Sequence, residues 1–215
     1  MIMSFLWGEL SVIWFSIEIL IFSFWIHKKI PSFYIKAKES VICASIELEK
    51  EVPEIKTSWI AAMVFTLPTL LIYMLSKDSE IAAITFVLGV LAYFDLTTRW
   101  IPDCLLYGTV WLSLGLNAEQ LLIQGVISAF LFTLPALILQ GYSLLTRRKG
   151  VFASGDLYLM PAIGVWFLPE LAPGLMACAL ILASFVSRYE KRVPFITCIL
   201  PIFIGYEVCE CSFLF

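Results

Sequence analysis

Two aspartates stand at the edges of apolar stretches in this sequence, where carboxylates could carry out acid–base chemistry. Asp95 ends one stretch in "LAYFDLTTRW", and Asp156 opens another in "ASGDLYLM". An aspartate at the centre of a membrane helix costs about 2.5 to 3.5 kcal/mol on insertion scales, so each such residue needs a reason. Two carboxylates that meet in a low-dielectric site share one proton, which lets one act as base and the other as acid. Such a pair is the minimum for activating a water against a peptide carbonyl.

Plainer interpretations of the acidic residues stand beside this one. Asp95 can pair with Arg99, one helical turn further on, and Asp156 can cap the helix that it begins. For Asp103 we favour a capping role over a place beside the site. We expect structural roles for Glu18 and for Glu207, which is near enough to a helix end for its carboxylate to reach the lipid headgroups.

The composition places these residues in an integral membrane protein. The chain has 215 residues, of which 61% are hydrophobic and 14% charged, and a mean hydropathy of +0.95. This predicts an all-α, polytopic fold with about eight transmembrane helices. The shortest segment, 157–169, would rise only about 20 Å, so it could begin earlier or be re-entrant. The predicted segments are 10–26, 59–75, 81–98, 104–118, 120–143, 157–169, 171–187 and 194–210.

The basic residues predict the orientation, because lysine and arginine in short loops accumulate on the cytoplasmic side. If all eight segments cross and the N-terminus lies outside, every lysine and arginine except Lys77 faces the cytoplasm. The C-terminus then also lies outside. Both Asp95 and Asp156 fall at the cytoplasmic end of their segments, so we expect them at the same depth.

Other features exclude some classes of function. The net charge of −3 and the dispersed cations give no footprint for nucleic acid. The six cysteines form no CxxC pair, and we expect no disulfide or metal contact at Cys209 and Cys211. The polar region 27–58 is predicted to be a partly helical cytoplasmic connector, in preference to an interfacial amphipathic helix over 31–51.

The segment "DLTTRWIPDCL", followed later by "ASGD", resembles the type IV prepilin peptidase family. These membrane aspartic proteases carry an aspartate before an IP dipeptide and a GxGD element. A third segment, "RVPFITCILPIFIG" at 192–205, is similar to the opening of the family's last helix. The resemblance spans about residues 59–215. The matching positions are Asp95, Arg99, Ile101, Pro102 and Leu105 in the first signature, and Gly155 and Asp156 in the second.

The resemblance implies that Asp95 and Asp156 are the catalytic aspartates. They would cleave the short basic leader of type IV prepilins or pseudopilins on the cytoplasmic face of a bacterial inner membrane, without metal or cofactor. Gly155 would admit the substrate backbone or permit a turn, and Pro102 would set the turn that aims Asp95 inward. Arg99 would anchor that end in the headgroups or bias the ionisation of Asp95. The peptidase domain would be 59–215, after an N-terminal helix and loop over 1–58; the sequence gives no oligomeric state.

Two departures from the family pattern affect the expected activity. Ala153 replaces the first glycine of GxGD, and Tyr158 stands where many members carry lysine. Bifunctional members bind zinc through paired CxxC motifs in the loop and also methylate the new N-terminus. Because Cys43 and His27 cannot complete a tetrahedral site, we predict a peptidase without methyltransferase activity. Acidic residues of the loop are the expected partners of the basic leader: Glu47, Glu49, Glu51 and Glu54.

Two other classes of function remain open from the sequence. A small proton- or ion-coupled transporter could use Asp95 and Asp156 as a relay or binding site. A transporter would place such carboxylates near the midplane of the bilayer, whereas both lie near one face here. A non-catalytic scaffold that keeps the fold is the third interpretation, which Ala153 leaves open.

Overall fold

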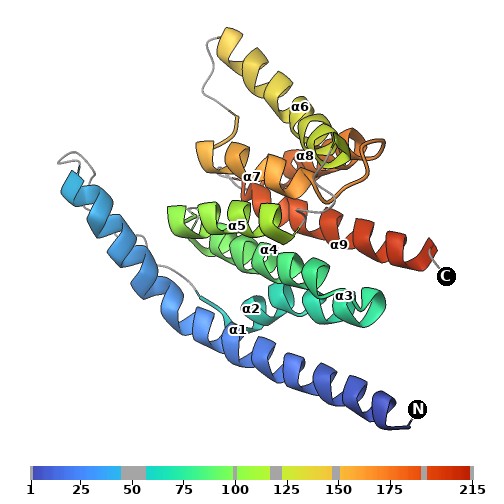
Figure 1. The fold of residues 1–215 in the computed structure, drawn as a ribbon. Coiled ribbons are helices and arrows are strands. Elements are labelled where there is room, and N and C mark those ends of the chain that lie inside the picture. The colour runs from blue at the N-terminus through green and yellow to red at the C-terminus, as the bar shows by residue number, and fades with distance from the viewer. Residues whose placement is uncertain are drawn as a thin grey trace. The chain divides into compact units, whose positions relative to one another are not determined.

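Within the described residues, the regular secondary structure is helical, and turns and short non-helical links join the helices. The structure is a computed structural model that describes residues 2–44, 57–98, 101–116, 123–146, 151–189 and 193–213. The helices form two compact units, residues 1–102 and 103–215. The functional division predicted after residue 58 stays a prediction. The helices are α1 (Ile2–Ala44), α2 (Trp59–Thr66), α3 (Pro68–Ser76), α4 (Ser79–Thr98), α5 (Asp103–Leu116), α6 (Ile123–Leu145), α7 (Ser154–Gly164), α8 (Ala172–Val186) and α9 (Phe195–Phe213) (Figure 1).

Every predicted segment contains a helix, which confirms the helical class over the described ranges. The helices α2 and α3 form one apolar stretch, interrupted at Leu67 by the proline that begins α3. In the part of the chain that the structure describes, four stretches are long and apolar enough to cross a bilayer, as expected of a polytopic membrane protein. The crossing of all eight segments and the placing of both termini outside stay predictions. The four stretches are Trp59–Ser76, Ser79–Thr98, Ile123–Leu145 and Phe195–Ser212.

Helix α1 refines the prediction for the polar region. It has 43 residues and passes through Pro31 to Ala44, so it is about 64 Å long. The connector predicted for 27–58 was expected to be partly helical, and it is helical throughout 27–44. Residues 45–56 lie outside the described residues. One buried face continues at helical spacing as far as the start of the polar region, through Ile19, Ser23, Ile26 and Ile30.

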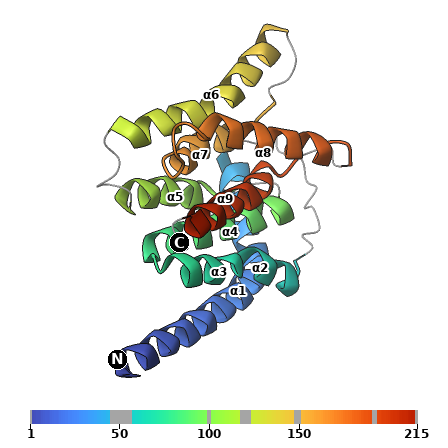
Figure 2. The same ribbon diagram turned by 90° about the vertical axis from the view of Figure 1, so that its right-hand side faces the viewer.

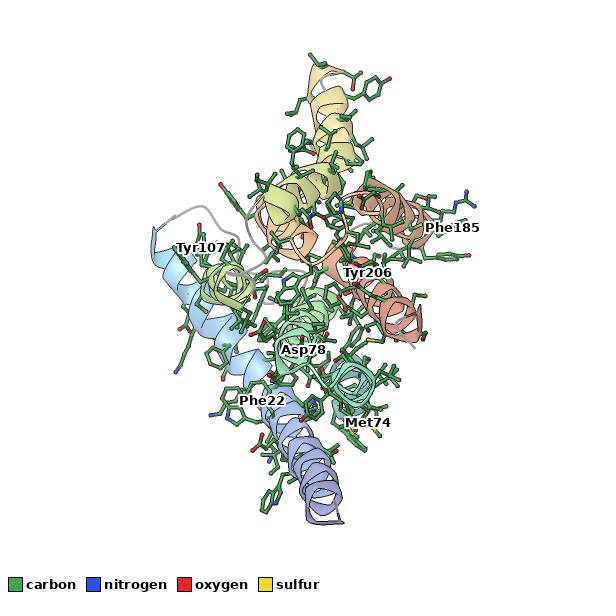
Figure 3. The ribbon with its side chains drawn as sticks, turned by 45° about the vertical axis from the view of Figure 1, so that its right-hand side comes forward. Phe22, Met74, Asp78, Tyr107, Phe185 and Tyr206 are labelled. Atoms are coloured by element: carbon green, nitrogen blue, oxygen red, sulfur yellow. The ribbon has the colours of Figure 1, made fainter. Side chains whose placement is uncertain are left out.

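Helix α4, which carries Asp95, is fixed at its start by a capping aspartate. Lys77 adopts a left-handed conformation (φ 56°) that ends α3. Asp78 follows, and its Oδ1 accepts hydrogen bonds from the N–H groups of Glu80 (2.7 Å) and Ile81 (3.4 Å) (Figure 3). This side chain satisfies two backbone donors at the first turn of α4.

Further along, α4 packs against α2 with unusually close backbones. A Cβ on Gly89 would lie 2.2 Å from the carbonyl oxygen of Phe65, so only glycine permits this contact. One turn later the Tyr93 hydroxyl donates to the Ser58 carbonyl (3.0 Å) and accepts from the Ser58 N–H (3.1 Å). These contacts fix the half of α4 that ends in the aspartate.

In the second unit, α7 packs against α5 and α6, and α8 packs against α6 and α9 (Figure 2). Helix α6 changes direction part-way along, as Figure 2 shows. Pro135 lies within this helix and removes one backbone hydrogen bond there. The two halves of α6 therefore pack along different directions.

Helix α7 differs from the predicted segment 157–169 at both ends. It begins at Ser154 and ends at Gly164, a rise of about 16 Å. Beyond it the N–H groups of Trp166 and Phe167 bond three residues back, and turns continue to Leu171. Pro169 has no N–H and disfavours a helical conformation in the residue before it, so the helix cannot extend there. The turn predicted around Glu170 is confirmed.

Candidate active site

Asp95 lies near the end of α4 and is buried, with 7% of its surface exposed. The residues from Leu88 to Phe94 are buried as well, so this half of α4 is enclosed on all sides. The hydrogen bonds between Tyr93 and Ser58 lie only two residues before the carboxylate. The backbone that carries Asp95 is thus held by packing and by hydrogen bonds.

The residues that follow Asp95 are described only in part. Arg99 lies outside the described residues, so its predicted pairing with Asp95 stays untested. Ile101 and Pro102 are the described, non-helical residues before α5, and Pro102 is buried. The turn that Pro102 is expected to set stays a prediction. Asp103 is exposed in the first turn of α5, where its negative charge interacts favourably with the helix dipole.

Asp156 is the third residue of α7 and is half-buried. The residue before the helix is Ala153, which forms no side-chain cap. Asp156 is therefore not at the N-cap position, although it lies within the first turn of α7. Its carboxylate lies in the first turn of α7, where a negative charge interacts favourably with the helix dipole.

The small residues before Asp156 have negative φ angles. Ala153 has φ −69° and ψ 153°, an extended conformation that any residue adopts. Among the described glycines none has a positive φ, so the turn predicted for Gly155 is wrong. Its lack of a side chain serves packing instead, because a Cβ there would lie 3.1 Å from Cδ1 of Leu106 on α5. The admission of substrate backbone at Gly155 stays a prediction.

The segment that leads into α7 is anchored by residues that the sequence analysis did not single out. The Oε1 of Gln140, on α6, accepts hydrogen bonds from the N–H groups of Val151 (2.8 Å) and Phe152 (3.1 Å). The ring of Phe152 packs edge-on against Phe195 of α9, with ring centroids 5.0 Å apart. The signal in the sequence that could have indicated this anchor is an isolated glutamine, Gln140, in an apolar segment.

The turn beyond α7 is fixed by side chains from neighbouring helices. The Ser113 hydroxyl donates to the Ala162 carbonyl and accepts from Nε1 of Trp166 (2.7 Å). Ala162 needs this donor because the Trp166 N–H bonds to Ile163 instead.

Two further side chains satisfy the backbone of the same turn. Ser128 donates to the Phe167 carbonyl (2.6 Å), and the Tyr206 hydroxyl accepts from the Leu168 N–H (3.2 Å) (Figure 3). Non-helical backbone at membrane depth is tolerated only where protein groups or water satisfy it. The surroundings of α7 are thus fixed after the helix as well as before it.

Two other acidic residues differ in their surroundings. Glu207 on α9 is buried, with 2% of its surface exposed, so the prediction that it extends to the headgroups is wrong. Glu18 is exposed on α1. No three side chains of His, Cys, Asp or Glu gather as a metal site in the described ranges. Since 45–56 lies outside them, the absence of a zinc site stays a prediction.

Asp95 belongs to the first compact unit and Asp156 to the second, and each is described within its own unit. Their meeting in one site therefore stays a prediction. Each unit presents one carboxylate within four residues of a helix end, on an element fixed by neighbouring groups. Two such carboxylates together could perform general acid–base catalysis.

Comparison with known proteins gives one match. Residues 82–188 match the model of the type IV leader peptidase family, a range that includes Asp95, Pro102, Gly155 and Asp156. No curated protein and no solved structure matches the chain.

Proposed function

We propose that this chain, which belongs to the type IV leader peptidase family over residues 82–188, is a membrane aspartic endopeptidase. Its substrates are type IV prepilins or pseudopilins, from which it removes the short basic leader at the cytoplasmic face of a bacterial inner membrane. The observation that carries the proposal is that the matched range contains both Asp95 and Asp156. Its membrane-spanning helices suit a substrate that is itself anchored in the bilayer.

In the proposed mechanism Asp95 and Asp156 share one proton. The ionised carboxylate takes a proton from a water, whose oxygen attacks the carbonyl carbon at the end of the leader. The protonated carboxyl donates to the carbonyl oxygen and stabilises the charge that develops there. When the C–N bond breaks, the nitrogen takes a proton, which leaves a carboxylate on the leader and an amine on the mature pilin. No metal takes part.

The remaining site residues have supporting roles in this proposal. Pro102 sets the turn after α4, and Arg99 anchors this end of the helix or biases the ionisation of Asp95. Gly155 keeps the first turn of α7 free of a side chain. The acidic residues between 47 and 54 attract the basic leader.

Methyltransferase activity is absent in this proposal. The region 27–58, which in bifunctional relatives is the loop with the paired CxxC motifs, contains one cysteine here, Cys43 at the end of α1. A thiolate and the imidazole of His27 supply two of the four ligands that a structural zinc site needs.

Co-expression with candidate prepilins tests the function. We expect the wild type to shorten at least one prepilin by its leader, and mass spectrometry of the product to show an unmethylated N-terminus. A methylated product would contradict the absence of methyltransferase activity. If the wild type cleaves no prepilin, and proton flux into vesicles instead depends on Asp95 and Asp156, the transporter interpretation replaces the peptidase.

A further inference from the structure

The side chain of Gln140 forms hydrogen bonds with the backbone immediately before α7. It lies on α6, five residues beyond Pro135, and is half-buried. Its Oε1 accepts from the N–H groups of Val151 and Phe152. Two consecutive backbone donors on one atom require an acceptor with two lone pairs, which identifies the oxygen of the amide group.

The start of α7 is weakly fixed by its own hydrogen bonds. Its cap position, Ala153, contributes no side-chain bond. The first intrahelical bond, from the Leu157 N–H to the Ala153 carbonyl, measures 3.4 Å, at the long end of the range for such bonds. The position of this turn therefore depends on the contacts of 151–152, among which the two bonds to Gln140 are directional.

From these contacts we propose that Gln140 is a positioning residue for Asp156, an inference that rests on the proposed peptidase activity. By fixing Val151 and Phe152 on α6, the amide sets where the first turn of α7 begins. It thereby sets where the carboxylate lies, four residues further on. A displacement of about 1 Å in a catalytic group can lower the rate by about 100-fold, so a contact outside the reacting atoms can control turnover.

The test uses the full chain in lipid nanodiscs, with a prepilin as substrate. Gln140→Met keeps the size of the side chain and removes the acceptor, while Gln140→Glu keeps an acceptor oxygen. Gln124→Met makes the same change at an exposed position of α6 and serves as the control. Both kcat and KM are measured, together with hydrogen exchange of the amides at 151 and 152.

We expect Gln140→Met to lower kcat by about 10- to 100-fold with little change in KM. Exchange at 151 and 152 should rise by about tenfold. Gln140→Glu should restore most of both values, and Gln124→Met should match the wild type. An unchanged kcat in Gln140→Met, or no rescue by Gln140→Glu, would overturn the positioning role.

Two further arms keep the result interpretable. If Gln140→Met does not fold, Gln140→Asn replaces it, since the shorter amide cannot reach both donors; wild-type kcat in that variant overturns the proposal. If the wild type cleaves no prepilin, the peptidase proposal fails by itself. Hydrogen exchange then still decides whether Gln140 holds the segment, and unchanged exchange in Gln140→Met overturns that claim.

Discussion

Ala153 and Gly155 occupy the two glycine positions of the GxGD-like element, and the two positions differ in what they require of a side chain. The extended backbone of Ala153 accommodates a Cβ without strain, whereas Gly155 leaves room for Leu106 of α5. The departure from the family pattern at Ala153 therefore does not require a loss of activity. The scaffold interpretation consequently loses the observation that motivated it.

Replacing Ala153 by glycine tests this interpretation. Because no positive φ is needed, we expect cleavage within about twofold of the wild type. We also expect a loss of roughly 0.4 to 1 kcal/mol in the free energy of unfolding, since glycine has more freedom in the unfolded chain. Prepilin cleavage and unfolding in mixed micelles measure the two quantities. A large gain in rate would show that alanine impairs the site.

Sequence alone could single out Asp95 and Asp156 as candidates, because a carboxylate in an apolar stretch is costly and therefore informative. It could not identify Gln140 or Ser113 as anchors. Their partners are backbone groups that become unpaired only once a helix starts or ends at a particular residue. The burial of Glu207 was missed because packing, and not distance from a helix end, determines it.

At the scale of elements, apolar length predicted where helices exist but not where they end. Helix α1 continues to Ala44 although its described buried face reaches only Ile30, and α7 stops at Gly164, five residues before Pro169. Helix boundaries depend on caps, prolines and tertiary contacts, which a hydropathy pattern does not contain. The close contact of α2 with α4 at Gly89 was equally absent from the pattern.

Gly89→Ala should separate α2 from α4, because the new Cβ would meet backbone that cannot move aside. We expect a loss of about 1 to 3 kcal/mol in the free energy of unfolding, and a lower cleavage rate because α4 carries Asp95. Gly108→Ala is the matched control, since a Cβ there meets nothing within 4 Å. The claim fails if both variants unfold like the wild type.

At the scale of the whole molecule, the account depends on the side of the membrane that each loop faces. The distribution of lysine and arginine predicts that the aspartates face the cytoplasm, which is the side on which the proposed cleavage of the leader takes place. The predicted orientation depends on whether the segment that contains the short helix α7 crosses the membrane. If that segment did not cross, the basic residues at 147–149 and at 188–192 would lie on opposite sides.

Labelling of introduced cysteines in intact cells measures this topology, after the native cysteines have been replaced. We expect Lys77→Cys to react with a membrane-impermeant maleimide from outside. Tyr189→Cys, an exposed site after α8, should react only after permeabilisation. Reaction of both sites from outside would mean that the predicted number of crossings between them is wrong.

The most direct measurement is cleavage of a co-expressed prepilin by variants that lack one carboxylate. Asp95→Asn and Asp156→Asn keep the shape of each side chain but remove its acid–base function, so each should lower the cleavage rate by at least about 100-fold. Asp78→Asn is the matched control, because asparagine caps a helix as well as aspartate does. All variants are compared at equal protein levels in the membrane. Loss of cleavage by Asp95→Asn and by Asp156→Asn, but not by Asp78→Asn, would support the aspartate pair. Full cleavage by either Asp95→Asn or Asp156→Asn would contradict it.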